Sequence, residues 1–170
     1  MPEDFKVIGF DPGETTGWAV LDNNGKMLTG GNVKSIEWEG IGKKKKASIS
    51  ADLLDLLDTL KANEYEMVVI EEYRVQQGKQ MMHTGKPVVT EQIVGILKAW
   101  AIRGRSRIML YRNTDKKIQQ MHSQQKPHGA HSGSHYVDAY NHAWWWLFQN
   151  KYVSSKLQQM KGVTNARKTS

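Results

Sequence analysis

The chain has 170 residues, of which 39% are hydrophobic, enough for one globular domain with a sizeable core. Cysteine is absent, which excludes disulfides, thiolate catalysis and any cysteine-ligated metal site. The formal net charge of +7 favours a polyanionic partner such as nucleic acid.

No apolar run approaches the ~20 residues that a membrane-spanning helix needs, so no membrane partner is expected. The N-terminal stretch MPEDFKV lacks the basic and then apolar pattern of a secretory leader. Together with the absence of cysteine, this favours a cytoplasmic location.

Three strands are predicted at the start of the chain. Residues 5–11 and 17–22 read as strands joined by a Pro-Gly loop, and a tight-turn signal, Asn-Asn-Gly, returns residues 26–33 as an antiparallel third strand. A polar loop rich in Gly and Lys follows. The leucine and isoleucine spacing over residues 47–62 then predicts a helix, with Ser48 or Ser50 as its N-cap.

The rest of the chain alternates between helices and strands. The pattern predicts a buried strand over residues 67–70, a loop over 73–87 and a helix over 88–103. It then predicts a strand over 107–112, a short helix over 114–121, a polar linker over 122–134 and a last helix over 135–149. This order implies an α/β fold with a five-stranded mixed sheet, made of a three-strand antiparallel meander plus parallel strands, and helices on both faces.

One domain is therefore predicted over residues 1–150. Residues 151–170 carry five basic and no acidic residues and are predicted to form a flexible basic tail. The run Lys43-Lys44-Lys45-Lys46 is a second basic block. Each block suits either contact with a polyanion or an ordinary solvated surface.

Three acidic residues stand where strands and a helix would bring them together. Asp11 ends the first strand, Glu71 ends the fourth, and Asp138 lies on the last helix. If the two strands are neighbours, their carboxylates lie side by side and repel each other unless a cation lies between them. Such oxygen ligands suit Mg²⁺ or Mn²⁺, and Asp138 would complete the site.

Histidines share the helix with Asp138. His135 precedes Asp138 by three residues, so both side chains face the same way and His135 is a candidate ligand. His142 lies on that face one turn further along, where the pattern favours an ordinary polar residue over a ligand.

The motifs VIGFDPGETTGWAVLD, VVIEEY and HYVDAYNHA resemble the three acidic motifs of the RuvC family of Holliday-junction resolvases, which have the RNase H-like fold. The resemblance extends over residues 5–149, in order and with compatible spacing. The small single domain and its divergent loops would also suit a phage-encoded member.

The resemblance implies a divalent-metal endonuclease that makes paired symmetric nicks in four-way DNA junctions and leaves 5′-phosphate and 3′-hydroxyl ends. Asp11, Glu71, His135 and Asp138 would be both the catalytic residues and the ligands of two Mg²⁺ ions, with Mn²⁺ able to substitute and no nucleotide cofactor. Asp11 would bridge the two ions. Glu72 is the alternative to Glu71 within its motif.

Basic and polar residues near these motifs are candidates for DNA contacts. They are Tyr73, Arg74, Gln76, Gln77, Lys79, Gln80, Lys86, Lys116 and Lys117. In the family an aromatic residue just past the glutamate probes the junction centre, usually at the third position. Here Tyr73 is at the second and Arg74 at the third, so the junction-opening role stays open. A mobile polar loop, or a solvated helix for the two last lysines, is the alternative.

Two apolar patterns remain. One is the helix stripe that the family uses to dimerise, and it would either form a homodimer interface or pack on its own sheet: Val89, Ile93, Ile96, Leu97 and Trp100. Two symmetric cuts favour the homodimer. The other is Trp144-Trp145-Trp146, which spreads around a helix and reads as core.

Other classes of protein are alternatives to a resolvase. Actin-like and sugar-kinase proteins share an Asp-x-Gly-Thr-Thr turn, but they need two such domains. A less specific branched-DNA or RNase H-type nuclease of the same fold is the nearer alternative, and a catalytically inactive junction-binding protein is another.

Overall fold

The computed structural model describes residues 4–40, 46–72, 86–112 and 135–153, with residues 86–88 and 112 described by their backbone alone. The predicted helix over 114–121, the linker over 122–134 and most of the basic tail lie outside these ranges, as does most of the loop after Glu72. Within the described ranges no helix is both long and apolar enough to cross a membrane.

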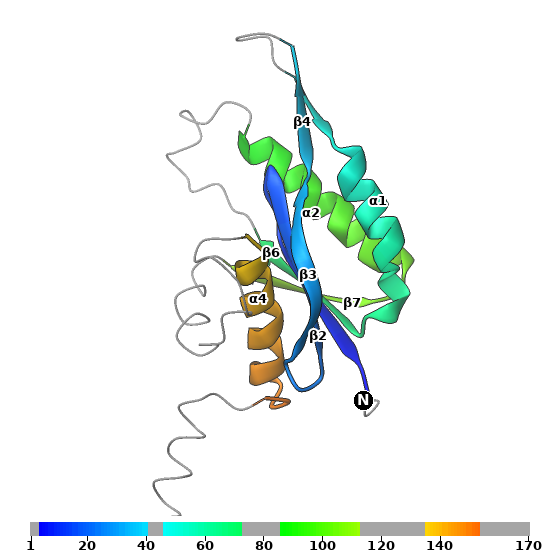
Figure 1. Ribbon diagram of the computed structural model, residues 1–170, viewed down its shortest axis with the longest axis vertical. Coiled ribbons are helices and arrows are strands. Elements are labelled where there is room, and N and C mark those ends of the chain that lie inside the picture. Colours follow the sequence, from blue (N-terminus) through cyan, green and yellow to red (C-terminus); the bar gives the residue numbers. More distant parts are fainter. Residues whose placement is uncertain (1–3, 41–45, 73–85, 113–134, 154–170) are drawn as a thin grey trace, which may run out of the picture.

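Five strands form one mixed sheet in the order β3-β2-β1-β6-β7 (Figure 1). Its strands are β1 (Lys6–Asp11), β2 (Thr15–Asp22), β3 (Met27–Lys34), β6 (Met67–Glu72) and β7 (Arg107–Arg112). The first three form an antiparallel meander, while β6 pairs in parallel with both β1 and β7. This confirms the predicted five-stranded mixed sheet.

Helices cover both faces of the sheet, as predicted. Helix α4 (His135–Gln149) lies on one face, and α1 (Ala51–Leu60) and α2 (Lys86–Arg103) lie on the other (Figure 1). The central strands β1 and β6 are therefore buried on both sides, and apart from charged residues at their ends they carry no polar side chain. Val7 of β1 packs in the α4 layer, and its neighbour Ile8 packs in the layer of α1 and α2.

Two glycines let α4 lie unusually close to the sheet. A Cβ atom added at Gly9 would overlap the Ala139 carbonyl, and one added at Gly17 would overlap the carbonyl of His135. The backbone of α4 therefore rests directly on β1 and β2 at the end where the helix begins. Further along, Trp144, Trp145 and Trp146 are all buried, which confirms them as core residues.

The predicted helix over residues 47–62 begins later and ends earlier. Ser50 caps α1, since its Oγ accepts a hydrogen bond from the Asp52 N–H at 3.2 Å. The helix ends at Leu60 and is followed by the short 3₁₀ helix η2 (Ala62–Glu64).

A second, two-stranded sheet occupies part of the predicted polar loop. Strands β4 (Ile36–Glu39) and β5 (Lys46–Ile49) pair in an antiparallel ribbon. Strand β4 lies in the predicted loop, and residues 47–49 of β5 lie in the predicted helix. Both predictions were wrong because strands of four residues are too short to show a clear alternation. We call this element the β4–β5 ribbon.

The apolar stripe of α2 packs on its own sheet. Val89, Ile93 and Leu97 are buried in the core with β1 and β6, and Ile96 packs partly buried against the same core. Trp100 donates its indole N–H to the Leu57 carbonyl at 2.8 Å. Val89, Ile93 and Leu97 therefore pack within the single chain, while Ile96 and Trp100 stay partly exposed. The homodimer role of the stripe stays a prediction.

Gly17→Ala is expected to destabilise the fold, because the new methyl group collides with the backbone at the start of α4. Overpacking of this kind costs about 1–3 kcal/mol, or about 2–12 °C in the melting temperature of a chain this size. Gly95→Ala on α2 is the control, since nothing lies within 4 Å of the added Cβ. Thermal unfolding followed by circular dichroism measures both, and an unchanged or higher melting temperature for Gly17→Ala contradicts the close-approach argument.

Candidate metal centre

Asp11 and Glu71 lie side by side at the C-terminal ends of β1 and β6, because these two strands are parallel neighbours in the sheet. Phe10 pairs with Ile70 in the register of β1 and β6, so the next residue on each strand is a carboxylate. Both side chains are nearly buried, with Asp11 6% and Glu71 7% exposed. Two carboxylates are thus held side by side with little water to separate their charges.

The alternation of side chains decides between Glu71 and Glu72. Val69 of β6 packs in the α4 layer and Ile70 in the opposite layer. Because successive strand residues point to opposite faces, Glu71 points toward α4 and Glu72 points away. Asp11 faces α4 for the same reason, since Val7, four residues earlier on β1, packs in that layer.

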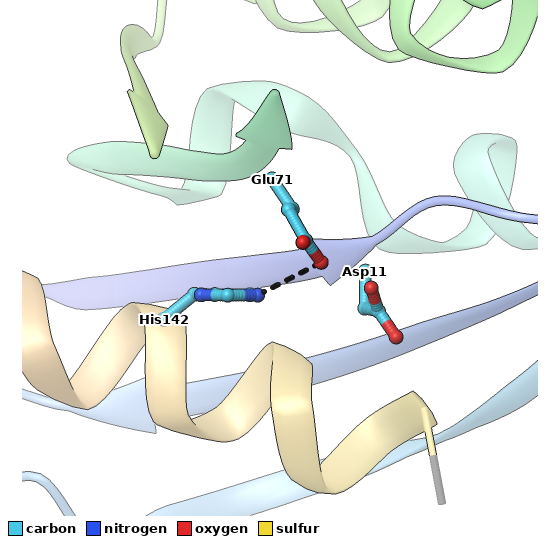
Figure 2. A group of neighbouring side chains, drawn as sticks. All are labelled: Asp11, Glu71 and His142. Carbon is cyan, nitrogen blue, oxygen red and sulfur yellow. Dashed lines mark hydrogen bonds and ion pairs between the residues drawn. The ribbon is translucent and has the colours of Figure 1, made fainter. Parts of the chain in front are cut away.

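His142 joins the two carboxylates from α4 (Figure 2). One ligand atom each from Asp11, Glu71 and His142 lies within 4.8 Å of the others. The His142 Nε2 atom is 3.3 Å from Oε2 of Glu71, and the fully buried imidazole ring stacks on the Tyr111 ring of β7 at a centroid distance of 6.5 Å. The two carboxylates supply the oxygen donors of a divalent-metal site, and His142 is close enough to hold Glu71 in place.

His135 contacts the same centre from the start of α4. Its Nδ1 atom lies 2.7 Å from Oδ2 of Asp11, while half of its side chain stays exposed. The following Tyr136 N–H donates to Oδ1 of Asn32 on β3 at 3.0 Å. This bond satisfies one of the backbone donors that every helix leaves unpaired at its first turn, and it ties α4 to the sheet beside the site.

Asp138 lies on the same helix face, between the two histidines. The spacing of His135, Asp138 and His142 places all three within about 60° around the helix axis. Asp138 is partly buried, and it lies outside the group of three whose ligand atoms are mutually within 4.8 Å. Of the four predicted ligands, the structure therefore brings Asp11 and Glu71 together and places His135 against Asp11, with Asp138 nearby on α4.

His142, which the sequence pattern predicts to be an ordinary polar residue, lies in the site. Its signal was present, because His142 follows Asp138 by four residues and so shares its face. The sequence could not show that this turn of α4 is buried, so that the His142 ring faces Glu71 and not solvent. The predicted DNA-contact side chains of Tyr73, Arg74, Gln76, Gln77, Lys79, Gln80, Lys86, Lys116 and Lys117 lie outside the described residues.

Buried hydroxyl groups hold the loop that follows Asp11. Thr16 is fully buried, and its Oγ1 lies 2.6 Å from the Ser35 Oγ, which donates to it. The same threonine oxygen lies 3.4 Å from both the N–H and the carbonyl of Gly13. The turn after β1 is thereby fixed, which in turn limits the positions that the Asp11 carboxylate can take.

The arrangement suits a hard divalent cation. Two nearly buried carboxylates repel each other, and a cation bound between them removes that repulsion. Carboxylate oxygens favour Mg²⁺ or Mn²⁺, and a single imidazole nitrogen is compatible with Mn²⁺ as well. Such a site can polarise a phosphoryl oxygen and lower the pKa of a bound water, which is the chemistry of phosphodiester hydrolysis.

No protein-family model and no curated protein matches the chain. Among solved structures, it is similar to Thermus thermophilus RuvC in complex with a Holliday junction substrate, with a TM-score of 0.58 and 16% identity over 89% of this chain and 98% of that chain. It is also similar to a structure of Thermus thermophilus RuvC, with a TM-score of 0.50 and 14% identity over 88% and 98% of the two chains. At these identities the likeness shows the fold, which is RNase H-like.

Divalent cations are expected to stabilise the protein through this centre. At 100 times its Kd, Mn²⁺ should raise the melting temperature by about 5–10 °C, since it binds the folded state alone. Asp11→Asn should remove most of that shift. Glu72→Gln, whose side chain points to the other face of the sheet, should keep it. A full shift in Asp11→Asn would place the binding elsewhere.

His142→Ala should weaken Mn²⁺ binding by about 10- to 100-fold, the usual effect of losing a residue that orients a ligand. The reason is that Glu71 loses a buried partner that fixes its carboxylate. His142→Gln, which retains a hydrogen-bond donor of similar reach, should recover part of the affinity. Calorimetric titration of the metal measures both variants, and equal affinity in His142→Ala and the wild type would exclude this role.

Proposed function

We propose that this chain is a RuvC-like endonuclease that resolves four-way DNA junctions. The observation that carries the proposal is the pair of nearly buried carboxylates, Asp11 and Glu71, at the edge of an RNase H-like sheet with His142 beside them. A structure of similar fold is described as bound to a Holliday junction substrate. The net charge of +7 suits a partner of that kind.

Divalent metal, Mg²⁺ with Mn²⁺ as a substitute, would be held by Asp11, Glu71, Asp138 and His135, with His142 orienting Glu71. When bound, two ions would activate a water for attack on the phosphate and stabilise the leaving 3′-oxygen. The products would carry 5′-phosphate and 3′-hydroxyl ends. The protein's own part is to hold its carboxylates in fixed positions before substrate arrives, which the two histidine contacts support.

Paired symmetric nicks need two active sites, so we propose that the enzyme acts as a homodimer. The predicted contact surface is on α2, where Ile96 and Trp100 are partly exposed while Val89, Ile93 and Leu97 fill the core of the single chain. On the exposed side of the same helix Ile102 is 65% exposed and is available to a partner.

A less specific nuclease acting on forks, flaps or RNA–DNA hybrids is the second candidate. The observation that favours it is the sequence after Glu71, where Tyr73 stands one position earlier than the aromatic residue of the family and Arg74 takes its place. A displaced aromatic residue would weaken the selection of four-way junctions without affecting the metal centre. The same motif departure is compatible with a junction-binding protein that does not cut.

The deciding experiment is a cleavage assay on end-labelled four-way junction, fork, flap, linear duplex and RNA–DNA hybrid, with Mg²⁺ or EDTA. The wild type should nick the junction in a metal-dependent, paired manner. Asp11→Asn and Asp138→Asn should each reduce the rate by more than about 100-fold, the upper range for residues that only support a ligand. Glu72→Gln should cut at nearly the wild-type rate.

The same assay separates the alternatives. Equal cutting of all branched substrates would indicate a general debranching nuclease, and cutting of the hybrid would indicate an RNase H-type enzyme. Metal-independent junction binding without cutting would exclude catalysis. Loss of activity in Glu72→Gln with retention in a Glu71→Gln variant would contradict the assignment of Glu71.

A further inference from the structure

One row of residues crosses the main sheet beneath the start of α4. Asp11 of β1 pairs with Gly17 of β2, and Gly17 pairs with Asn32 of β3. Directly paired residues of antiparallel strands point to the same face of a sheet, which here is the face that carries α4. Since neighbouring strands lie about 4.8 Å apart, the backbones of Asn32 and Asp11 are about 10 Å from each other in this row.

Asn32 is bonded to the first turn of α4. Its side-chain Oδ1 atom accepts a hydrogen bond from the Tyr136 N–H at 3.0 Å. The first backbone N–H groups of a helix have no partner within the helix, and the usual partner is the side chain of the residue just before it. Asn32 precedes Tyr136 by 104 residues, so this cap comes from the sheet.

The first turn of α4, which lies beside Asp11 (Figure 2), is held on both sides of Gly17. Toward β1, the His135 Nδ1 atom lies 2.7 Å from Oδ2 of Asp11, and toward β3, Tyr136 donates to Asn32. Gly17 lets the helix approach, because an added Cβ would overlap the His135 carbonyl, but a glycine has no side chain that could hold the helix in place. The contacts on either side therefore fix where the helix begins.

Asparagine is otherwise an unfavourable residue at this position. Asn32 is exposed and lies inside the eight-residue strand β3, and strands are depleted in asparagine. Gly30 and Gly31 precede it, so this part of β3 also lacks residues that favour extended structure. Residues that conflict with the local propensity are expected at functional sites. The bond to Tyr136 gives Asn32 such a role.

We propose that Asn32 is a positioning residue of the metal centre, which holds the first turn of α4 so that His135 and Asp138 are in place before a metal ion binds. Both residues lie within one turn of the bonded Tyr136 N–H, so a first turn released from Asn32 would no longer hold them at a fixed distance from Asp11. The inference rests on the proposed function, which assigns the ligand roles to His135 and Asp138.

The bond itself is tested by hydrogen exchange of the Tyr136 amide, followed by NMR in the metal-free full chain. Asn32→Ala removes the acceptor, and exchange should become about 2- to 30-fold faster, the range that loss of a helix cap corresponds to. Asn32→Asp, which keeps an acceptor oxygen at the same place, should restore the wild-type rate. Asn24→Ala is the matched control, because Asn24 is exposed in the β2–β3 turn and its side-chain amide donates to Asn23.

The positioning role is tested by calorimetric titration with Mn²⁺ at a temperature below the unfolding of every variant. Asn32→Ala should bind Mn²⁺ about 2- to 30-fold more weakly, because ligands released from the cap must be ordered when the ion binds. Asn32→Asp should recover the affinity, and Asn24→Ala should keep it. Asn32→Ala should also nick a saturating four-way junction more slowly, while its affinity for the junction in EDTA stays at the wild-type value, because Asn32 acts through the helix.

The outcomes separate this inference from the proposed function. Faster Tyr136 exchange in Asn32→Ala with unchanged Mn²⁺ affinity would make Asn32 a helix cap alone and overturn the inference. Recovery of the affinity in Asn32→Asp without recovery of the exchange rate would be an effect of the added charge and would overturn it as well. Weaker junction binding in EDTA with normal Mn²⁺ affinity would identify a DNA contact instead. If the wild type cuts no DNA, but Asn32→Ala loses Mn²⁺ affinity and Asn32→Asp regains both quantities, the positioning role stands and the proposed nuclease function falls.

Discussion

The close contact between α4 and the sheet is the constraint on which the candidate site depends. Gly9 and Gly17 have no side chains to keep the helix away, so its backbone rests on β1 and β2. Only at that distance can the His135 ring reach Asp11 and the His142 ring reach Glu71. A helix held further from the sheet would leave the two carboxylates without these partners. The glycines are thus as much a part of the site as the ligands.

Placing two carboxylates at the buried edge of a sheet is unfavourable for folding, and the surrounding structure offsets that cost in identifiable ways. Each carboxylate contacts one histidine of α4, and the Tyr111 ring packs against the more deeply buried of these. Tyr111 is itself held through its hydroxyl, which donates to Gln149 at the end of α4 at 2.5 Å. One helix therefore supplies the partner of Asp11 at its start and the partner of Glu71 near its middle, and it supports Tyr111 at its end.

A feature of the fold or of the site was predictable from the sequence where it depends on residues close together in the chain or on the ends of apolar runs. Asp11 and Glu71 were predictable because each ends an apolar run, and parallel strands bring such ends together. His135 was predictable from its spacing to Asp138. The position of His142 in the site was not predictable, because it depends on burial: the His142 ring is fully buried and stacks on the Tyr111 ring. The β4–β5 ribbon was missed because its strands are too short to show a period.

The contact between His142 and Glu71 bears on how a metal could bind without rearranging the site. A carboxylate has two oxygens, and His142 lies 3.3 Å from one of them, Oε2 of Glu71. An imidazole that holds one oxygen fixes the plane of the group and so directs the other, as partners of metal ligands commonly do. His135 holds one oxygen of Asp11 in the same way, at 2.7 Å. His135 is half exposed and His142 is fully buried, so His142 is the more firmly held of the two supports.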